Sequence, residues 1–234
     1  MHLPIVNSTA AAVPVPSGVV AGNTILVVLF LDGASGSSIT ITPPSGAGTW
    51  SEAPSSPQQC TSSEKFGLRV FVKTANGSDS GTYDFTLGTS TYREGVALRF
   101  TGADTTTPFN TANGSGAATN SATTPAVSVT TTVIDCLLVW VGMLWTDGTC
   151  TPPAGFTEVY DQIASGGGTD TGLSVAYLAQ AATGSSGSLT GTFSKSSGIA
   201  AWLGALRPAG GGAPAPARIV NESLTASVRR AGFY

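Results

Sequence analysis

Two long apolar runs constrain the fold of this chain more than any other feature. One covers residues 136–145 and the other residues 23–31. A membrane-spanning helix needs roughly twenty apolar residues, so neither run is long enough to be one. Both are rich in β-branched or aromatic residues, and each ends near an Asp-Gly turn signal, at 32–33 and 147–148. The pattern predicts two strands, each buried on both faces.

The sequence after each run also matches. Thr42-Pro43-Pro44 corresponds to Thr151-Pro152-Pro153, Gly67-Leu68-Arg69-Val70 to Gly172-Leu173-Ser174-Val175, and Ala97-Leu98-Arg99 to Ala205-Leu206-Arg207. These matches indicate a twofold internal repeat, with repeat one at about 21–103 and repeat two at about 125–208.

Shorter segments in both halves alternate between apolar and polar residues with period two, which is typical of strands, and none has helical periodicity. They lie at 68–73, 82–87, 95–100, 173–178, 188–193 and 199–206. The fold class is therefore predicted to be all-β. We expect one jelly-roll-like antiparallel β-sandwich over 21–208, with each half supplying strands to both sheets. The reason is that the central strand of each half is apolar on both faces, and half of the chain alone has too few residues to cover both faces. Two packed lobes are the alternative.

Extended arms are expected at both ends. Residues 1–20 contain Pro4, Pro14 and Pro16 but neither the charged region nor the apolar region of a signal peptide, and this favours an N-terminal arm. Residues 51–66 are interpreted as an exposed loop and 101–124 as a bridge between the halves. Gly, Pro and Ala dominate the linker 209–217, which precedes a C-terminal arm at 218–234.

The C-terminal arm has a composition suited to docking on a neighbouring subunit. It has three basic residues and one acidic residue, whereas the whole chain has 10 basic and 13 acidic residues. The arm could therefore order on an acidic neighbour, although a disordered terminus is the common alternative. The candidate partner-binding residues are Arg218, Ile219, Val220, Leu224, Val228, Arg229, Arg230, Phe233 and Tyr234.

Charge and cysteine content narrow the function classes. Only 10% of residues are charged and the net charge is −3, with no basic cluster that would favour nucleic acid. So few charges also suit a surface covered by copies of the chain or by a partner. Cys60, Cys136 and Cys150 are interpreted as thiols, although a pair between Cys60 and Cys150 is possible.

The sequence gives little support for catalysis. The one histidine, His2, lies in the expected arm, so a Ser-His-Asp or Cys-His site cannot be placed in the body. Glu158 and Asp161 are a possible carboxylate pair for glycoside hydrolysis, and Asp32 and Asp147 occupy matched turns. Solvated turn acids are the more common role. We expect a protein that is not an enzyme and has no catalytic, cofactor-binding or metal-binding residues.

Four tryptophans remain to be assigned. Trp140 and Trp202 lie inside apolar strands and are predicted to be core residues. Trp50 and Trp145 lie at strand ends beside polar loops, where an aromatic ring can stack on a sugar. An aromatic at these matched positions more often closes the end of a sandwich.

The repeated pattern resembles a known group of proteins. An apolar strand is followed by Thr-Pro-Pro-x-Gly and an aromatic residue (42–50 and 151–156), then by Gly-Leu-x-Val and a Gly/Ser-rich hairpin, and it closes on Ala-Leu-Arg-Pro (205–208). Over roughly residues 20–208 this is similar to β-sandwich virion proteins of tailed bacteriophages, particularly those of actinobacteria.

The resemblance implies a structural role in the virion and transfers no catalytic residue. It implies a head decoration or minor capsid protein made in the host cytoplasm, with the major capsid protein or other virion subunits as partners and homo-oligomers expected. Neither nucleic acid nor a membrane is an expected partner. The alternative is a minor tail, baseplate or fibre module that binds cell-surface carbohydrate through Trp50, Trp145 or exposed loops.

Overall fold

The computed structural model describes residues 2–33, 38–46, 48–61, 65–166, 169–210 and 219–220. Within these ranges the chain forms strands and no helix, and the strand pairings are antiparallel. The described residues thus include no helix able to cross a membrane. The prediction of an all-β antiparallel sandwich is confirmed.

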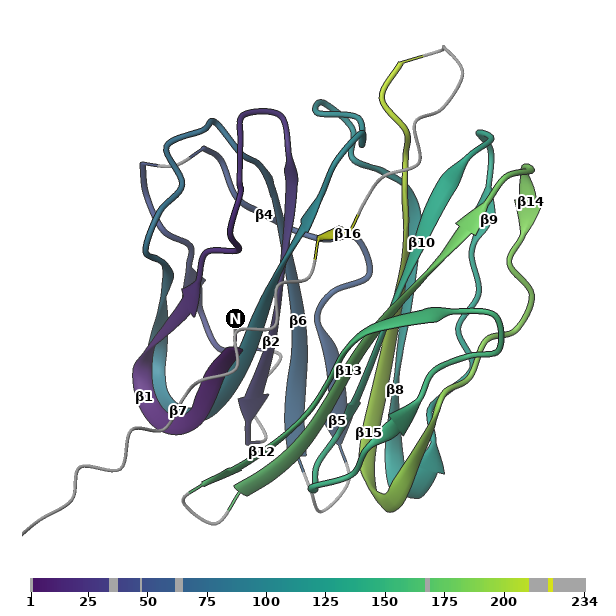
Figure 1. Ribbon diagram of the computed structural model, residues 1–234. Helices are drawn as coiled ribbons and strands as arrows, with labels where there is room; N and C mark the ends of the chain where they lie inside the picture. Colours follow the sequence, from purple (N-terminus) through teal and green to yellow (C-terminus); the bar gives the residue numbers. More distant parts are fainter. Residues whose placement is uncertain are drawn as a thin grey trace, which may run out of the picture.

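Two large sheets account for most of the strands (Figure 1). The first contains β1 (His2–Pro14), β2 (Thr24–Asp32), β3 (Ile41–Thr42), β4 (Ser51–Glu52), β5 (Gln58–Thr61), β6 (Lys65–Thr74), β7 (Thr82–Phe100) and β16 (Ile219–Val220). The second contains β8 (Phe109–Thr123), β10 (Cys136–Leu144), β11 (Cys150–Thr151), β12 (Thr157–Gly166), β13 (Thr169–Gln180) and β15 (Thr192–Leu206). A small third sheet pairs β9 (Thr130–Thr131) with β14 (Gly184–Ser185).

The two apolar runs are β2 and β10, and each lies at the centre of its sheet. β2 pairs with β6 and β7, and β1 lies outside β7. β10 pairs in the same way with β13 and β15, and β8 lies outside β15. The strand orders of the two halves therefore correspond, while the twofold sequence repeat stays a prediction.

Each large sheet is built from one half of the chain, apart from the short β16. The first sheet otherwise uses residues 2–100 and the second residues 109–206. The expectation that each half supplies strands to both sheets, as in a jelly roll, is therefore wrong. The reason is that β7 is 19 residues long and bends, so the first half covers the outer face of its own central strand. Figure 1 shows β1 and β7 curling together at one side of the molecule.

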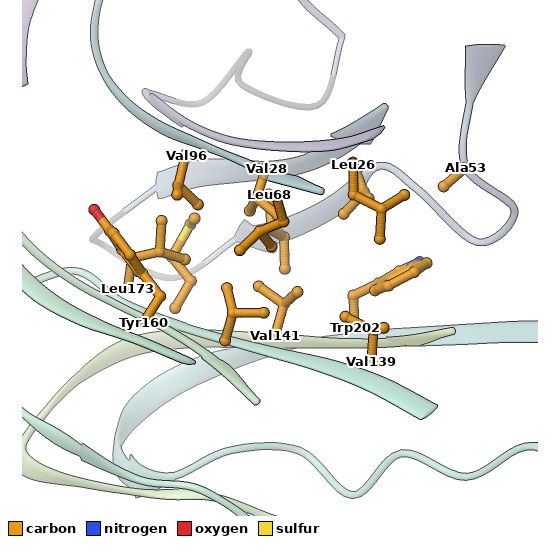
Figure 2. Packing of buried hydrophobic residues seen from close by; sticks show 14 of the residues in the cluster. Leu26, Val28, Ala53, Leu68, Val96, Val139, Val141, Tyr160, Leu173 and Trp202 are labelled. Carbon is orange, nitrogen blue, oxygen red and sulfur yellow. The ribbon is translucent and has the colours of Figure 1, made fainter. Parts of the chain in front are cut away.

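The inner faces of the two sheets pack on each other and form the central cluster, which contains residues of both halves. Leu26, Val28, Leu68 and Val96 meet Val139, Val141, Leu173 and Trp202 there (Figure 2). Full burial of an aliphatic or aromatic side chain stabilises a fold by about 1.5–3 kcal/mol, so this interface is a major source of stability.

Each half also has an outer cluster of its own. In the first half, Tyr83 and Phe85 of β7 pack with Val13 of β1 over Ile25 and Val27 of β2. In the second half, Phe193 and the segment around Val127 and Val129 cover Trp140 of β10. The molecule therefore combines features of the single sandwich and of the two packed lobes. Its halves share the central cluster, and each half also has an outer cluster of its own.

Several segments expected outside the sandwich belong to it. Residues 2–14, expected as an arm, form β1, and the bridge contains β8. The expected exposed loop at 51–66 contributes β4, β5 and the buried residues Ala53, Cys60 and Phe66. These segments have weak strand patterns of their own and are held by pairing with neighbouring strands, as β1 is with β7 and β8 is with β15.

Candidate functional site

The two tryptophans proposed to bind carbohydrate pack inward. Trp50 is 9% exposed and contacts Tyr83 and Phe85 edge to face, with ring centroids 5.0 and 5.1 Å away. Trp145 is half-buried, with its ring 5.8 Å from Phe30 and 6.2 Å from Phe66. The role of Trp50 as an open sugar platform is thus wrong, because its ring faces are covered. Trp50 belongs to the outer cluster of the first half, and Trp145 packs against the central cluster.

Little of the predicted docking arm can be placed. Ile219 and Val220 form β16 and pair with Phe100 and Arg99 of β7. The other candidates, Arg218, Leu224, Val228, Arg229, Arg230, Phe233 and Tyr234, lie outside the described residues. The assignment of this arm to partner binding stays a prediction.

The three cysteines are buried free thiols. Cys60 belongs to the central cluster, whereas Cys136 and Cys150 belong to the outer cluster of the second half. The possible pair between Cys60 and Cys150 does not form, because the second sheet lies between the two clusters.

Asp147 acts as a turn acid. Its carboxylate lies 2.5 Å from Nζ of Lys195, and both side chains are substantially exposed. The hydrogen bond from Lys195 is the main cause that lowers the pKa of Asp147, with a second contribution from the Thr146 hydroxyl. Exposed pairs of this kind contribute little to stability.

Glu158 and Asp161 do come together on one face of β12. In a regular strand, residues three apart point to opposite faces, but β12 has a bulge at Val159. The bulge sets Glu158 opposite Ala176 and Asp161 opposite Ser174, two positions on the same face of β13. This carboxylate pair is the one cluster of acids that both sequence and structure single out.

The two carboxylates accept hydrogen bonds, and these bonds are partly buried. The Ser174 hydroxyl donates to Oε1 of Glu158 at 2.9 Å, and the Cys150 amide donates to both carboxylate oxygens of Asp161 at 3.2 Å. Burial raises the pKa of both acids, and it raises the pKa of the Cys150 thiol to about 12. A thiol with so high a pKa is not a nucleophile at neutral pH.

No metal site is visible in the part of the chain that the structure describes. Its residues contain no group of three or more His, Cys, Asp or Glu side chains arranged to hold an ion. The pair of Glu158 and Asp161 therefore offers two ligands, fewer than calcium usually takes from a protein.

A second polar cluster lies between the two sheets. Glu94 of β7 is fully buried, and its Oε2 accepts a hydrogen bond from the hydroxyl of Thr171 on β13. Burial raises the pKa of the neighbouring Tyr160 hydroxyl, and the nearby charge of Glu94 raises it further. No sequence pattern indicates this cluster, because Glu94 falls between the predicted strands 82–87 and 95–100.

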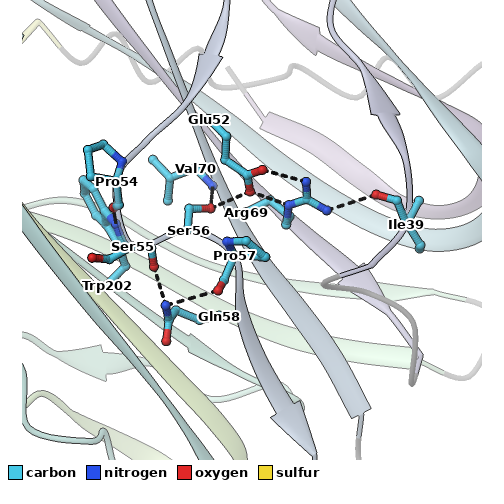
Figure 3. Close-up of polar contacts among 10 residues, drawn as sticks. All are labelled: Ile39, Glu52, Pro54, Ser55, Ser56, Pro57, Gln58, Arg69, Val70 and Trp202. Atoms are coloured by element: carbon cyan, nitrogen blue, oxygen red, sulfur yellow. Dashed lines mark hydrogen bonds and ion pairs between the residues drawn. The ribbon is translucent and has the colours of Figure 1, made fainter.

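The loop from 52 to 58 ties the first half to the second (Figure 3). Arg69 donates from Nε and Nη2 to the carboxylate of Glu52, at 2.5 and 2.8 Å, and from Nη1 to the carbonyl of Ile39 at 3.1 Å. The Trp202 indole then donates to the carbonyl of Pro54 at 2.9 Å. These contacts connect the loop to β6 of the first half and to β15 of the second (Figure 3).

A third polar cluster is enclosed by the outer layer of the first half. Lys73 and Asp79 form an ion pair there whose side chains have no exposed surface. The rings of Trp50 and Tyr83 flank the Lys73 ammonium, with centroids 5.1 and 4.7 Å from Nζ. A lysine and an aspartate are seldom buried completely.

Comparison with known proteins identifies no family for this chain. No family model matches the chain, and no curated protein or solved structure is significantly similar to it. The class that the fold defines is an antiparallel β-sandwich whose buried polar groups connect its layers.

Proposed function

We propose that this protein is a structural component of a tailed-bacteriophage virion, a decoration or minor capsid protein that binds the assembled shell and stabilises it. The observation that carries the proposal is the pair of long outer strands, β1 and β8. Neither has an Asp, Glu, Lys or Arg residue. Strand edges are normally protected by charges, by proline or by bulges, so a long uncharged edge favours pairing with another chain.

β8 is the stronger candidate for such pairing. It pairs on one side with β15 and has no proline along its 15 residues. Near its start, Asn110 exchanges hydrogen bonds with Thr132, and the carbonyl of Ala112 accepts one from the Ser55 hydroxyl. Gly114 also lies against the side chain of Gln58 in β5, and the remaining residues, 115–123, pair with β15 alone among the described strands. On the opposite edge of the same sheet, β12 has the charged residues Glu158 and Asp161, which are typical protective features.

The distribution of charge supports the same proposal. Only 10% of the chain is charged, and Arg69, Lys73, Arg93 and Glu94 are buried. The outer surface is therefore dominated by Ser, Thr, Gly and Ala, which suits extended contact with neighbouring subunits. Many weak contacts of this kind give strong attachment when they act together.

The sequence pattern adds the biological setting. Its likeness to β-sandwich virion proteins supports a capsid shell as the partner and homo-oligomers as the form in which the subunit binds. A rigid body with buried polar junctions suits a particle that must persist without repair.

Reconstitution tests the proposal directly. Purified full-length protein, and a version that ends at Pro208, are added to capsids that lack the protein and are imaged by electron microscopy. Full-length protein at regular capsid positions supports decoration, and loss of binding on truncation assigns attachment to the C-terminal arm. Binding only to tails or to host cell wall would contradict decoration and favour the adhesion alternative.

A point variant tests the strand edge. Asn120 is exposed on β8, so Asn120→Lys adds a charge to the edge without removing a core contact. We expect it to reduce capsid occupancy or self-association at least severalfold, because a like charge would be repeated at each contact. Ser188→Lys adds the same charge at an exposed loop position and is the control. Equal occupancy of the two variants would rule out the edge as the contact.

A further inference from the structure

The ion pair between Lys73 and Asp79 is unusual because both side chains are fully buried and their charged groups touch. Lys73 lies near the end of β6, and Asp79 lies in the connection from β6 to β7. Nζ of Lys73 is in direct contact with Oδ1 of Asp79, and neither side chain has any exposed surface. The reacting groups of a possible amide bond are therefore held together and kept from water.

The surrounding groups are aromatic or hydrogen-bonding. Trp50 and Tyr83 flank Nζ of Lys73, and the Tyr83 hydroxyl donates to Oδ1 of Asp79 at 2.9 Å. Burial, with Asp79 adding to it, raises the pKa of Tyr83, so this hydroxyl keeps its proton. Oδ2 of Asp79 is buried and has no hydrogen-bond partner among the described residues.

We propose that Lys73 and Asp79 condense to form an intramolecular isopeptide bond. The ammonium first transfers one proton to Oδ1, which gives a neutral amine and a neutral carboxylic acid. The nitrogen lone pair then attacks the carboxyl carbon, and a C–N bond forms. The bond from carbon to Oδ1 breaks, and this oxygen leaves as water with its acid proton and one proton from the amine. No oxidant or other co-reactant is needed.

Three features of the site favour the reaction. Two groups held in contact by a fold react as if at very high concentration. The Tyr83 hydroxyl is placed to donate to the oxygen that leaves. Finally, an ion pair in an apolar cluster carries a large desolvation cost, and condensation replaces both charges with a neutral amide. The competing arrangement is a permanent ion pair, which the two aromatic rings would stabilise through cation–π contacts.

Tryptic digestion followed by mass spectrometry distinguishes the two arrangements. In the unlinked protein, trypsin cleaves after Arg69, Lys73 and Arg93 and yields peptides 70–73 and 74–93. An acylated Lys73 is not cleaved, so the linked protein yields the single peptide 70–93, lighter than its sequence by one water molecule. The intact folded protein shows the same deficit.

Two variants locate the bond and the role of folding. Lys73→Met is expected to abolish the deficit. Lys195→Met removes the exposed partner of Asp147, an ion pair of the same residue types, and is expected to keep the deficit. If folded wild-type protein keeps its full sequence mass after long incubation, or peptide 70–93 appears at full mass, the pair is ionic only and the proposal is overturned. The wild-type measurement decides even if Lys73→Met does not fold, and it is independent of any role in a virion.

Discussion

Two strand glycines make room for the largest side chains in the molecule. The ring of Trp140 lies over Gly142, and the ring of Trp202 lies over Gly204, in each case two residues further along the same strand. A Cβ at either glycine would overlap the ring. Glycine by itself weakens a strand, so the presence of Gly142 in β10 and Gly204 in β15 is explained by this close approach.

The two tryptophans differ in one respect that can be measured. Both are fully buried, but the Trp202 indole donates to the carbonyl of Pro54, whereas the Trp140 indole has no partner among the described residues. Trp202→Phe and Trp140→Phe both lose packing, and only the first loses a hydrogen bond. We expect Trp202→Phe to lower the free energy of unfolding by about 1 kcal/mol more than Trp140→Phe does. Urea unfolding gives both values, and equal losses would show that the bond to Pro54 adds nothing.

The carboxylate pair on β12 predicts a dependence of stability on pH. The pKa values of Glu158 and Asp161 are raised in the folded state, mainly by burial, so this state binds more protons than the unfolded chain in a window that opens near the usual carboxyl pKa of about 4. Their contribution to stability is therefore present at low pH and is lost as pH rises through the raised values. In the double variant Glu158→Gln/Asp161→Asn, both side chains can still accept their hydrogen bonds.

Comparison of the two proteins tests this linkage. From about pH 4 to pH 7 the free energy of unfolding of the wild type should fall relative to that of the double variant. Asp147→Asn is the control of opposite sign, because the pKa of Asp147 is lowered and its contribution is lost as pH falls. A wild-type to double-variant difference that stays constant with pH would contradict the assignment.

At the scale of elements, β7 determines how the first half is built. Its last residues, 93–100, pair with β2, and its first residues, 82–86, pair with the end of β1 in the outer layer. Gly95 lies where these layers meet, and a Cβ there would come within 2.7 Å of Leu29 and 3.1 Å of Val13. The bend therefore needs a residue without a side chain at this position.

Gly95→Ala tests that requirement. Overpacking of a well-packed site costs about 1–3 kcal/mol, and we expect a loss in this range because Leu29 and Val13 are both fully buried. Gly88→Ala is the matched control in the same strand, since its Cβ would make only ordinary contacts with Thr40, the nearest at 3.4 Å. The midpoint of urea unfolding compares the two variants. If they are equally stable, the outer layer is loosely packed over β2.

The sequence predicted the elements better than their extents and contacts. The apolar runs identified β2 and β10, because continuous burial leaves a continuous pattern. The pattern predicts separate strands at 82–87 and 95–100, since the residues between them, Gly88 to Glu94, do not alternate. The structure instead has one bent strand over the whole segment. The periodicity of apolar residues indicates which faces of a strand are buried, but it does not indicate where a strand bends.

The candidate site shows the same limit. Sequence placed Glu158 beside Asp161, but only the bulge at Val159, which pairing with β13 reveals, turns them to one face. The enclosure of Lys73 and Asp79 depends on Trp50, which is remote from both in the sequence. The burial of Asp79, an acid in the connection from β6 to β7, depends on the layer that folds over it, and that layer leaves no local pattern around residue 79.

At the scale of the whole molecule, the two halves are joined through the central cluster. Val28 of β2 and Val141 of β10 are fully buried in it, and the Trp202 and Glu94 hydrogen bonds cross between the halves. Each half also has its outer cluster. The molecule should nevertheless unfold as one unit, because separating the halves would expose the inner faces of both sheets to water.

Val141→Ala tests this cooperativity, with Val20→Ala as control because Val20 is 57% exposed. Truncation of a buried aliphatic side chain costs about 2 kcal/mol or more, and hydrogen exchange of backbone amides shows where that loss is felt. If unfolding is global, the most protected amides of β2 and β10 lose the same protection free energy, although only β10 is changed. If only β10 amides lose protection, the first half stays folded when the second half unfolds. Each half would then unfold separately, and its outer cluster would be enough to keep it folded. Equal loss in both strands is expected, since each central strand has one of its two faces covered by the opposite half.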